Sequence, residues 1–214
     1  MFYDAIENKH GLRHDPFKAL IVPRPIGWVS TMSKTGELNL APYSYFNGFN
    51  SWPQIVGFSS ESMKDSASFA IETGEFTWSM ATWALREQMN ATSEGLPRGR
   101  SEFDYAGLAT AASTLVRPPR VAESPAALEC KVTQVLKLLD TEGKETGGTV
   151  VFGQVIGFHI EERYMKNGRF DLAAVQPIAR CGYDEYAVVE RVFSLKRPES
   201  GGNSFGGGPA PRKD

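Results

Sequence analysis

Small hydroxyl side chains gather where strand-like segments in the first third of the chain end. Ser30 and Thr31 close the run IGWVST, and Ser44 follows NLAPY. Ser59 and Ser60 end the run QIVGFSS. Hydroxyls and backbone amides at strand ends can hydrogen-bond the edge of a flat polar ring and a hydroxylated chain attached to it. The alternative is that these residues are ordinary turn formers.

The sequence Lys64-Asp65-Ser66 opens a segment with helical character. The first N–H groups of a helix are free, and the helix dipole favours negative charge there, so a lysine and a hydroxyl at this point predict an anion site. Upstream, Ala41 and Pro42 would let the backbone lie close to a ligand plane. Together these features predict a site for a flat polar ring that carries a phosphate. A solvated helix cap is the alternative for Lys64 and Asp65.

The elements that must position these side chains are mostly strands. Residues rich in β-branched and aromatic types, separated by turn formers, predict strands, whereas a cap residue followed by good helix formers predicts a helix. We expect strands within 18–33, 37–49, 54–61, 75–82, 127–140, 147–165 and 170–190, and helices that start at Asp65 or Ser66 and end at Gly74, within 83–93, and near 101–108.

This order of elements lacks strict strand–helix alternation, which argues against a doubly wound parallel sheet and favours a mainly-β barrel with helical insertions. We predict a polar lead-in over 1–18, one domain over 19–197, and a disordered Gly/Pro-rich tail over 198–214.

Composition and charge exclude several classes of protein. A net charge of −2 over 214 residues excludes a strongly basic, dedicated nucleic-acid binder. No apolar run approaches the length of a membrane span, and the N-terminus lacks the apolar core of a signal peptide, so we expect a cytoplasmic protein without membrane contacts. Cys130 and Cys181 are too few for a disulfide framework and are expected to be buried or half-buried thiols. The histidines His10, His14 and His159 do not form a metal-binding set.

Several strings in a fixed order resemble a known family. PRPIGWVST, NLAPYSYFN, FSS, KDS and TGEF are followed by EFDYAGL, RVAESPAALEC, FGQVIGFHI and PIARCGYDEY. In this order and spacing the chain resembles the flavin reductase-like, FMN-binding split-barrel proteins, the group that contains flavoredoxin, over roughly residues 16–186. The resemblance implies a six-stranded antiparallel Greek-key barrel, usually a homodimer with FMN near the interface.

Carried over by position, the resemblance also implies which residues bind FMN. Ser30 and Thr31 would lie near the ring or the ribityl chain, Ser59 and Ser60 near the phosphate end, and Lys64 and Ser66 on the phosphate; the strand along the flavin would contain Asn39, Ala41, Pro42, Ser44, Tyr45 and Phe46.

Two arginines complete the candidate set. Arg24 lies between two prolines, which restrict its backbone, so its guanidinium could be aimed at a phosphate; the alternative is an exposed arginine on an edge strand. Arg180, with Tyr183, could cover the site from a late strand or from a partner subunit, or form an ordinary interface ion pair.

The implied activity is that of an NAD(P)H:FMN oxidoreductase, which passes a hydride from NAD(P)H to FMN and electrons on to an acceptor or a monooxygenase partner. No catalytic acid or base is predicted, because the cofactor carries the chemistry. A flavoredoxin-type electron carrier and a non-catalytic flavin-binding protein remain alternatives. No motif selects NADH over NADPH.

Overall fold

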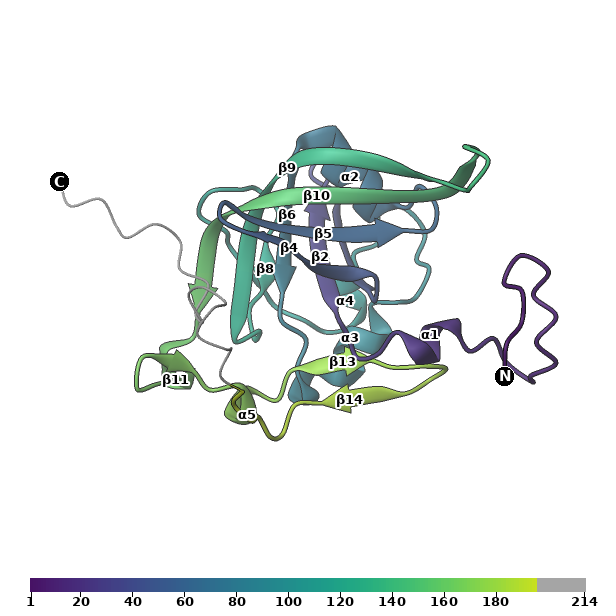
Figure 1. Ribbon diagram of the computed structural model, residues 1–214. Helices are drawn as coiled ribbons and strands as arrows, with labels where there is room; N and C mark the ends of the chain where they lie inside the picture. The colour runs from purple at the N-terminus through teal and green to yellow at the C-terminus, as the bar shows by residue number, and fades with distance from the viewer. Residues whose placement is uncertain (196–214) are drawn as a thin grey trace.

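The computed structural model describes residues 1–195. Its main sheet has seven antiparallel strands in the order β3-β2-β6-β9-β10-β5-β4 (Figure 1). The predicted tail over 198–214, and the last two residues of the predicted domain, lie outside the described residues. The strands of this sheet are β2 (Gly27–Met32), β3 (Leu38–Tyr43), β4 (Phe46–Ser51), β5 (Gln54–Ser60), β6 (Glu75–Ser79), β9 (Ala126–Leu139) and β10 (Glu145–Ile160).

The connection between β3 and β4 closes this sheet into a barrel. The two strands lie at opposite edges of the sheet, although only Ser44 and Tyr45 separate them in the chain. The sheet must therefore curl until its edges come together. The N–H of Ser59 on β5 donates to the Tyr45 carbonyl at 2.8 Å, which continues the pairing of β4 with β5 into the connection.

The mainly-β barrel expected from the sequence is confirmed, with a different strand count. The segment 37–49 forms two strands rather than one, because the chain changes edges at Ser44 and Tyr45, so the main sheet has seven strands instead of six. Pro42 lacks an N–H, and its place on the edge strand β3 leaves no ladder hydrogen bond unmade.

The three predicted helices are present. Helix α2 (Asp65–Thr73) ends at Gly74, whose φ of 73° is readily available to glycine, and its N-cap is Lys64, one residue before the first predicted cap. The second helix begins as the 3-10 turn η1 (Trp83–Leu85) and continues as α3 (Arg86–Ala91). The third, α4 (Glu102–Tyr105), is capped by Ser101, whose side chain accepts from the Phe103 N–H.

Two segments predicted as strand form short helices instead. These are α1 (Phe17–Leu20), which overlaps the start of the first predicted strand, and α5 (Leu172–Val175), whose first turn is capped by the Asp171 side chain. The rest of the late segment forms β13 (Ile178–Arg180) and β14 (Tyr186–Val188), which pair with each other. β13 also pairs with β1 (Arg24–Pro25), and the three strands make a small separate sheet. The remaining elements are β7 (Thr110–Ala111), β8 (Arg120–Val121), η2 (Glu162–Tyr164), β11 (Met165–Lys166) and β12 (Arg169–Phe170).

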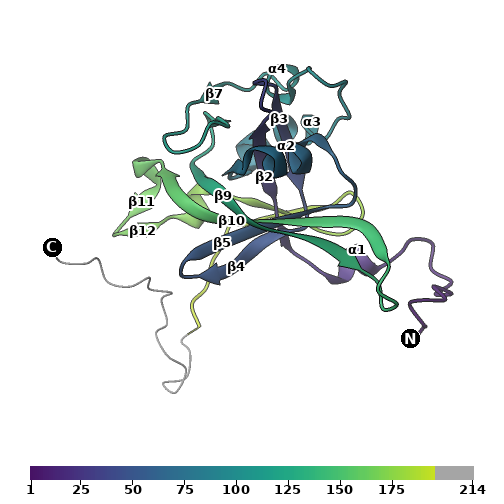
Figure 2. The ribbon, with the colours of Figure 1, turned by 90° about the horizontal axis from the view of Figure 1, so that it is seen from above.

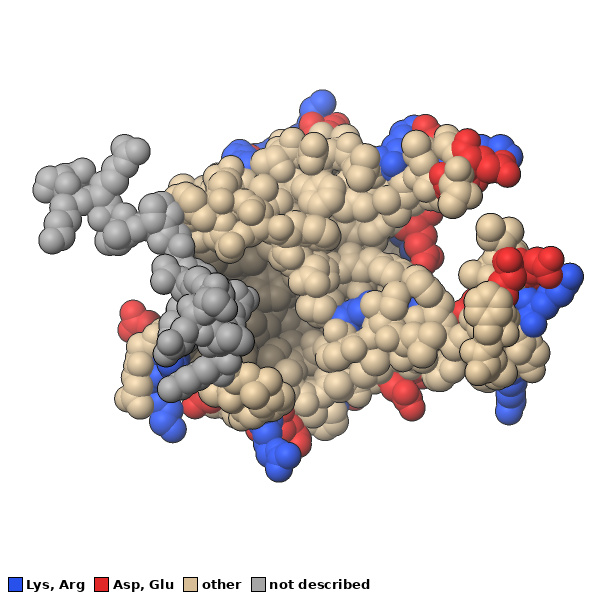
Figure 3. Space-filling model, viewed as in Figure 1, with Lys and Arg blue, Asp and Glu red and all other residues tan. Residues whose placement is uncertain are grey.

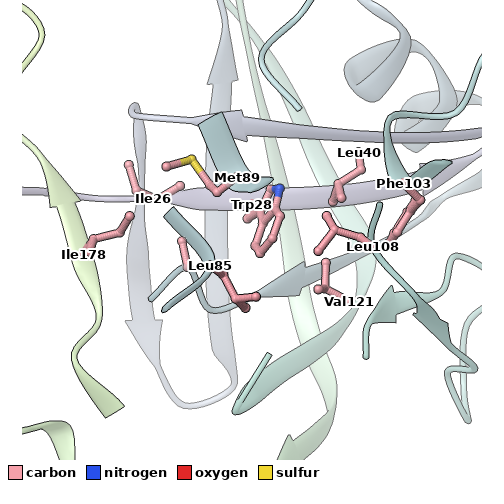
Figure 4. Close-up of a cluster of buried hydrophobic side chains, with 10 residues drawn as sticks. Ile26, Trp28, Leu40, Leu85, Met89, Phe103, Leu108, Val121 and Ile178 are labelled. Atoms are coloured by element: carbon pink, nitrogen blue, oxygen red, sulfur yellow. The ribbon is translucent and has the colours of Figure 1, made fainter. Parts of the chain in front are cut away.

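A buried cluster around Trp28 joins the helices to the barrel (Figure 4). Met89 from α3 and Phe103 from α4 pack in this cluster with Leu40 of β3. The Trp28 indole N–H donates to the Thr92 hydroxyl at 2.9 Å. Burial of each large apolar side chain contributes about 1.5–3 kcal/mol, so the cluster holds the segments before and after residues 92–96 firmly in place.

One face of the barrel is nearly free of charge. The strands β4 and β5 contain no Lys, Arg, Asp or Glu, and the space-filling view shows mostly uncharged residues over β10, β5 and β4 (Figure 3). Phe49 on β4 and Trp52 just after that strand are 58% and 56% exposed. The β9–β10 hairpin extends beyond the barrel in both ribbon views and exposes Leu136 and Leu139 near its tip (Figures 1 and 2).

Candidate functional site

A cavity of about 520 Å³ lies beside the seam between β3 and β4. Its wall is made by β3, the two seam residues, the end of β5, the start of α2, the segment 92–96 and Glu102 of α4. The barrel closure thus brings together segments that are far apart in the chain. Of the residues predicted from the sequence, the cavity is lined by Asn39, Ala41, Pro42, Ser44, Tyr45, Ser59, Ser60, Lys64 and Ser66.

The start of α2 gives one end of the cavity the character of an anion site. Lys64 is the N-cap residue and has an extended backbone, but its side chain accepts no hydrogen bond from the helix. The N–H groups of the first turn have no partner within the helix, and Lys64 does not supply one. The Lys64 ammonium forms no ion pair within the described residues 1–195. Both features favour a negatively charged group at this point.

A buried hydrogen-bond network supports the same end of the cavity. Glu102 is 6% exposed, and its carboxylate accepts from the Leu40 N–H at 2.9 Å and from the Asn39 amide nitrogen at 3.2 Å. The Asn39 amide oxygen in turn accepts from the Ser66 hydroxyl. Burial raises the pKa of Glu102, the charge of Asp65 adds to that rise, and these hydrogen bonds only partly offset it.

The Tyr43 hydroxyl is a buried polar group without a hydrogen-bond partner among the described residues. The side chain is 9% exposed and packs its ring against Phe58, with the ring centroids 4.9 Å apart. Burial raises the pKa of Tyr43, although the nearby hydroxyls of Ser66 and Ser60 act to lower it. Tyr43 is therefore a neutral phenol at the cavity wall, with an O–H that is free to donate.

The charges around the cavity are mixed. Lys18 and Lys64 line it, and so do Glu61, Asp65, Glu94 and Glu102. The ammonium group of Lys18 lies 3.6 Å from the Glu61 carboxylate, and both side chains are exposed. Attraction for an anion is thus local to the start of α2 rather than a property of the whole cavity.

Arg24 does not line the cavity. It is 6% exposed, and its guanidinium donates to the backbone carbonyls of Lys18, Ile21 and Cys181. The side chain therefore ties the segment around α1 to the loop after β13. Its carbon Cζ lies 5.9 Å from the centroid of the Tyr45 ring, so its closest relation to the cavity is through that ring.

Three further residues that were predicted to bind FMN lie in the barrel wall and do not line the cavity. Ser30 and Thr31 on β2 are completely buried, and their hydroxyls have no hydrogen-bond partner among the described residues. Phe46 stacks on Trp78, with ring centroids 5.8 Å apart and planes 4° from parallel. A Cβ atom on Gly27 would lie 2.7 Å from the Phe46 Cβ, so this packing requires glycine at 27.

Arg180 belongs to a different cavity, of about 530 Å³, between α3 and the small sheet. Its Cζ lies 4.6 Å from the centroid of the Tyr186 ring, and its guanidinium donates to the Tyr183 carbonyl. Arg86, also in this lining, stacks on Trp83.

Sequence reasoning missed several lining residues, among them Lys18, Glu61 and the segment 92–96, and two of those missed, Tyr43 and Glu102, are buried. Tyr43 stands inside the NLAPYSYFN string, where alternation along a strand could have assigned its side chain to either face. Glu102 follows the cap residue Ser101 and so looks like an ordinary acidic residue of a first helical turn. No spacing in the sequence shows that its carboxylate turns toward Asn39 and Leu40.

The other sequence expectations concern thiols, metals and membranes. Cys130 is buried, with a pKa raised by burial, and Cys181 is half-buried; both are free, as expected. Within residues 1–195, no three His, Cys, Asp or Glu side chains are grouped closely enough to hold a metal ion. No helix in this part of the chain has the length and apolar character needed to cross a membrane.

Comparison with known proteins identifies relatives of both the sequence and the fold. The family model "Flavin reductase like domain" matches residues 19–172. An uncharacterized protein of Halalkalibacterium halodurans is 34% identical over 183 residues, covering 83% of this chain and 87% of that protein.

Among solved structures, nitrilotriacetate monooxygenase component B from Bacillus cereus is 31% identical, with a TM-score of 0.80 over 88% of this chain and 96% of that chain. Flavoredoxin of Desulfovibrio vulgaris (Miyazaki F) shares the fold, with a TM-score of 0.73 and 20% identity over 92% of this chain and 99% of that chain.

Proposed function

Because the chain belongs to the flavin reductase-like family, we propose that it binds FMN in the cavity beside α2 and transfers hydride from NAD(P)H to that flavin. Electrons then pass to an acceptor or to a partner monooxygenase. The observation that carries the proposal is that nine residues assigned to FMN binding by sequence resemblance line one cavity.

The residues present fit FMN on three counts. The cavity of about 520 Å³ falls within the range of roughly 300–1,000 Å³ that is usual for small-molecule sites. The unpartnered Tyr43 hydroxyl is a donor that only a ligand or solvent can satisfy. The uncapped start of α2, with Lys64 beside it, suits the phosphate.

The protein's part in the reaction is to bind and orient the ring system. When bound, FMN supplies the redox chemistry itself. The edge strand β3 has backbone groups that do not pair with β2, and those between Ala41 and Ser44 are available for the polar edge of the ring. N–H donors near the N1–C2=O edge stabilise the negative charge that develops there on reduction. No protein acid or base is required.

We assign the partners on similar grounds. Nitrilotriacetate monooxygenase component B, at 31% identity, supports a reductase that works with a second protein. The uncharged face over β4, β5 and β10, with Phe49 and Trp52 exposed beside it, is the surface we propose for a homodimer. Two unpaired cysteines suit the reducing cytoplasm.

The test of this function is an anaerobic titration. The purified protein, mixed with FMN and freed of excess, is expected to show flavin absorbance, and NADH or NADPH is expected to bleach it. Bleaching supports the reductase. Flavin absorbance without bleaching favours an electron carrier or a binding protein, and a protein that stays colourless contradicts the proposal.

The phosphate contact is tested by Lys64→Ala. Loss of this cationic side chain from the cavity lining is expected to weaken FMN binding about tenfold, or about 1.4 kcal/mol, measured by quenching of flavin fluorescence. Lys144→Ala, at the exposed turn between β9 and β10, is the matched control and should leave the dissociation constant unchanged. An unchanged constant in Lys64→Ala would contradict the assignment.

A further inference from the structure

Ser66 has only one hydroxyl hydrogen, and the network around it uses that hydrogen. The Ser66 hydroxyl donates to the Asn39 amide oxygen. The orientation of the Asn39 amide is fixed from the other side, because its nitrogen donates to Glu102 at 3.2 Å. Glu102 is itself held by the Leu40 N–H at 2.9 Å. A carboxylate accepts only, so the Asn39 nitrogen must face it and the Asn39 oxygen must face Ser66.

Ser66 is thereby committed to the protein and has no hydrogen left for an anion. The opposite holds for Tyr43 at the same wall of the cavity. Its hydroxyl is buried, has no hydrogen-bond partner among residues 1–195, and lies near Ser60 at the end of β5 and Ser66 at the start of α2. The Ser60 hydroxyl, in turn, donates to the Ser62 carbonyl at 2.6 Å. Of these three hydroxyls, only that of Tyr43 retains a free hydrogen.

We propose that the Tyr43 hydroxyl, and not that of Ser66, donates the hydroxyl hydrogen bond to the phosphate of the flavin, and that Glu102 acts through Asn39 to position Ser66. This inference rests on the proposed function and divides the polar end of the cavity into two roles. Tyr43 contacts the ligand, together with Lys64 and the first turn of α2. Glu102, Asn39 and Ser66 form the support that holds the start of α2 against β3.

The test compares FMN with riboflavin, which has the same ring and ribityl chain but no phosphate. Dissociation constants are measured by fluorescence quenching at pH 8, where the phosphate is a dianion because its second pKa is about 6. For Tyr43→Phe we expect FMN binding to weaken at least about tenfold, as for loss of a hydrogen bond to a charged group, with riboflavin binding changed less than about threefold. The ring contact with Phe58 is retained in this variant.

Ser66→Ala gives the matched comparison, with Ser66→Thr as the variant that keeps the hydroxyl. Because Ser66 supports the wall, Ser66→Ala is expected to weaken FMN and riboflavin by similar factors, and Ser66→Thr to restore both. The preference for FMN is the ratio of the riboflavin dissociation constant to the FMN dissociation constant. Loss of this preference in Ser66→Ala, or an unchanged preference in Tyr43→Phe, would overturn the inference.

Unfolding in urea supplies a readout that does not depend on flavin. A hydroxyl without a partner in the folded chain contributes no hydrogen bond, so Tyr43→Phe is expected to keep or raise the unfolding midpoint. A lower midpoint would show that the hydroxyl has a partner in the protein and would overturn the inference. If the wild-type protein binds neither flavin, the proposed function fails, and this inference fails with it. If wild-type binding is normal and the FMN preference persists in Tyr43→Phe, only the inference fails.

Discussion

Two buried carboxylates in this protein have pKa values that move in opposite directions. Glu102 is 6% exposed and Glu129 is 1% exposed, and burial is the largest single influence on both, raising each pKa. At Glu129 the N–H groups of residues 114–116 and the His159 ring outweigh burial, so its pKa is lowered. At Glu102 the backbone N–H groups of Leu40 and of Glu102 itself and the Asn39 amide do not outweigh burial, and its pKa stays raised.

The difference separates a structural carboxylate from one that borders a binding site. Glu129 accepts from Thr114 at 2.7 Å and from Val116 at 3.0 Å, and so fastens the loop after β7 to the barrel strand β9. Glu102 lines the cavity with some of its hydrogen-bonding capacity unused. The number of donors around a buried acid, rather than its depth, shows which role it has.

The largest effect is expected for removal of the saturated carboxylate. Glu129→Ala leaves the N–H groups of residues 114–116 without their acceptor, and we expect it to reduce the free energy of unfolding by about 3 kcal/mol, measured with urea. The exposed Glu123, replaced by alanine, is the control and should change stability by less than about 0.5 kcal/mol. A loss no larger than in the control would remove the distinction between the two acids.

A smaller effect is expected at the other acid. Glu102→Ala deprives the Leu40 N–H and the Asn39 amide of an acceptor, but cavity water can reach these groups, so we expect a loss of about 1–2 kcal/mol. The Glu102→Ala variant should bind both FMN and riboflavin more weakly. The Glu129→Ala variant, measured under conditions in which it remains folded, should bind both normally. If Glu102→Ala proved the more destabilising of the two, the comparison would be reversed.

The smallest effect concerns pH. Because the pKa of Glu129 is lowered on folding, its contribution is present above the ordinary value near 4.5 and is lost as pH falls through the folded pKa. The stability deficit of Glu129→Gln should therefore shrink on acidification. The pKa of Glu102 is raised on folding, so its favourable contribution to stability is present below about 4.5 and is lost as pH rises through the folded pKa. The stability of Glu102→Gln relative to the wild type should therefore increase as pH rises through that range.

These slopes are limited to about 1.4 kcal/mol for each unit of pKa difference. Urea unfolding curves at a series of pH values for the wild type and both glutamine variants would measure them. Slopes of the same sign in the two variants would contradict the opposite pKa directions.

The sequence predicts the strands and turns of this barrel better than its closure. Alternation and turn residues located β5, β6 and the β9–β10 pair, and a glycine stop located the end of α2. The break at Ser44 and Tyr45 was not predicted, because hydroxyl and aromatic residues are acceptable within a strand. The break between β3 and β4 depends on tertiary structure, because it forms where the two edges of the sheet meet.

The candidate site follows the same division. The hydroxyls of Ser44, Ser59 and Ser60, predicted from their places at strand ends, line the cavity together with Lys64 and Ser66 at the start of α2. Ser30 and Thr31, predicted on the same grounds, are buried in the barrel wall instead. Arg24 and Arg180 were chosen for their chemistry, but side-chain direction is set by partners distant in the chain, such as the Cys181 carbonyl and the Tyr186 ring. Tyr43 and Glu102 were missed for that reason as well.

The two-residue seam has a consequence for how this barrel would respond to an occupant. Ser44 and Tyr45 form cavity wall and also carry the chain from one margin of the sheet to the other. A molecule resting on them would brace the circumference of the barrel at the point where its two edge strands meet. Occupancy would then damp motion around the whole ring of strands, including β9 and β10 on the side away from β3.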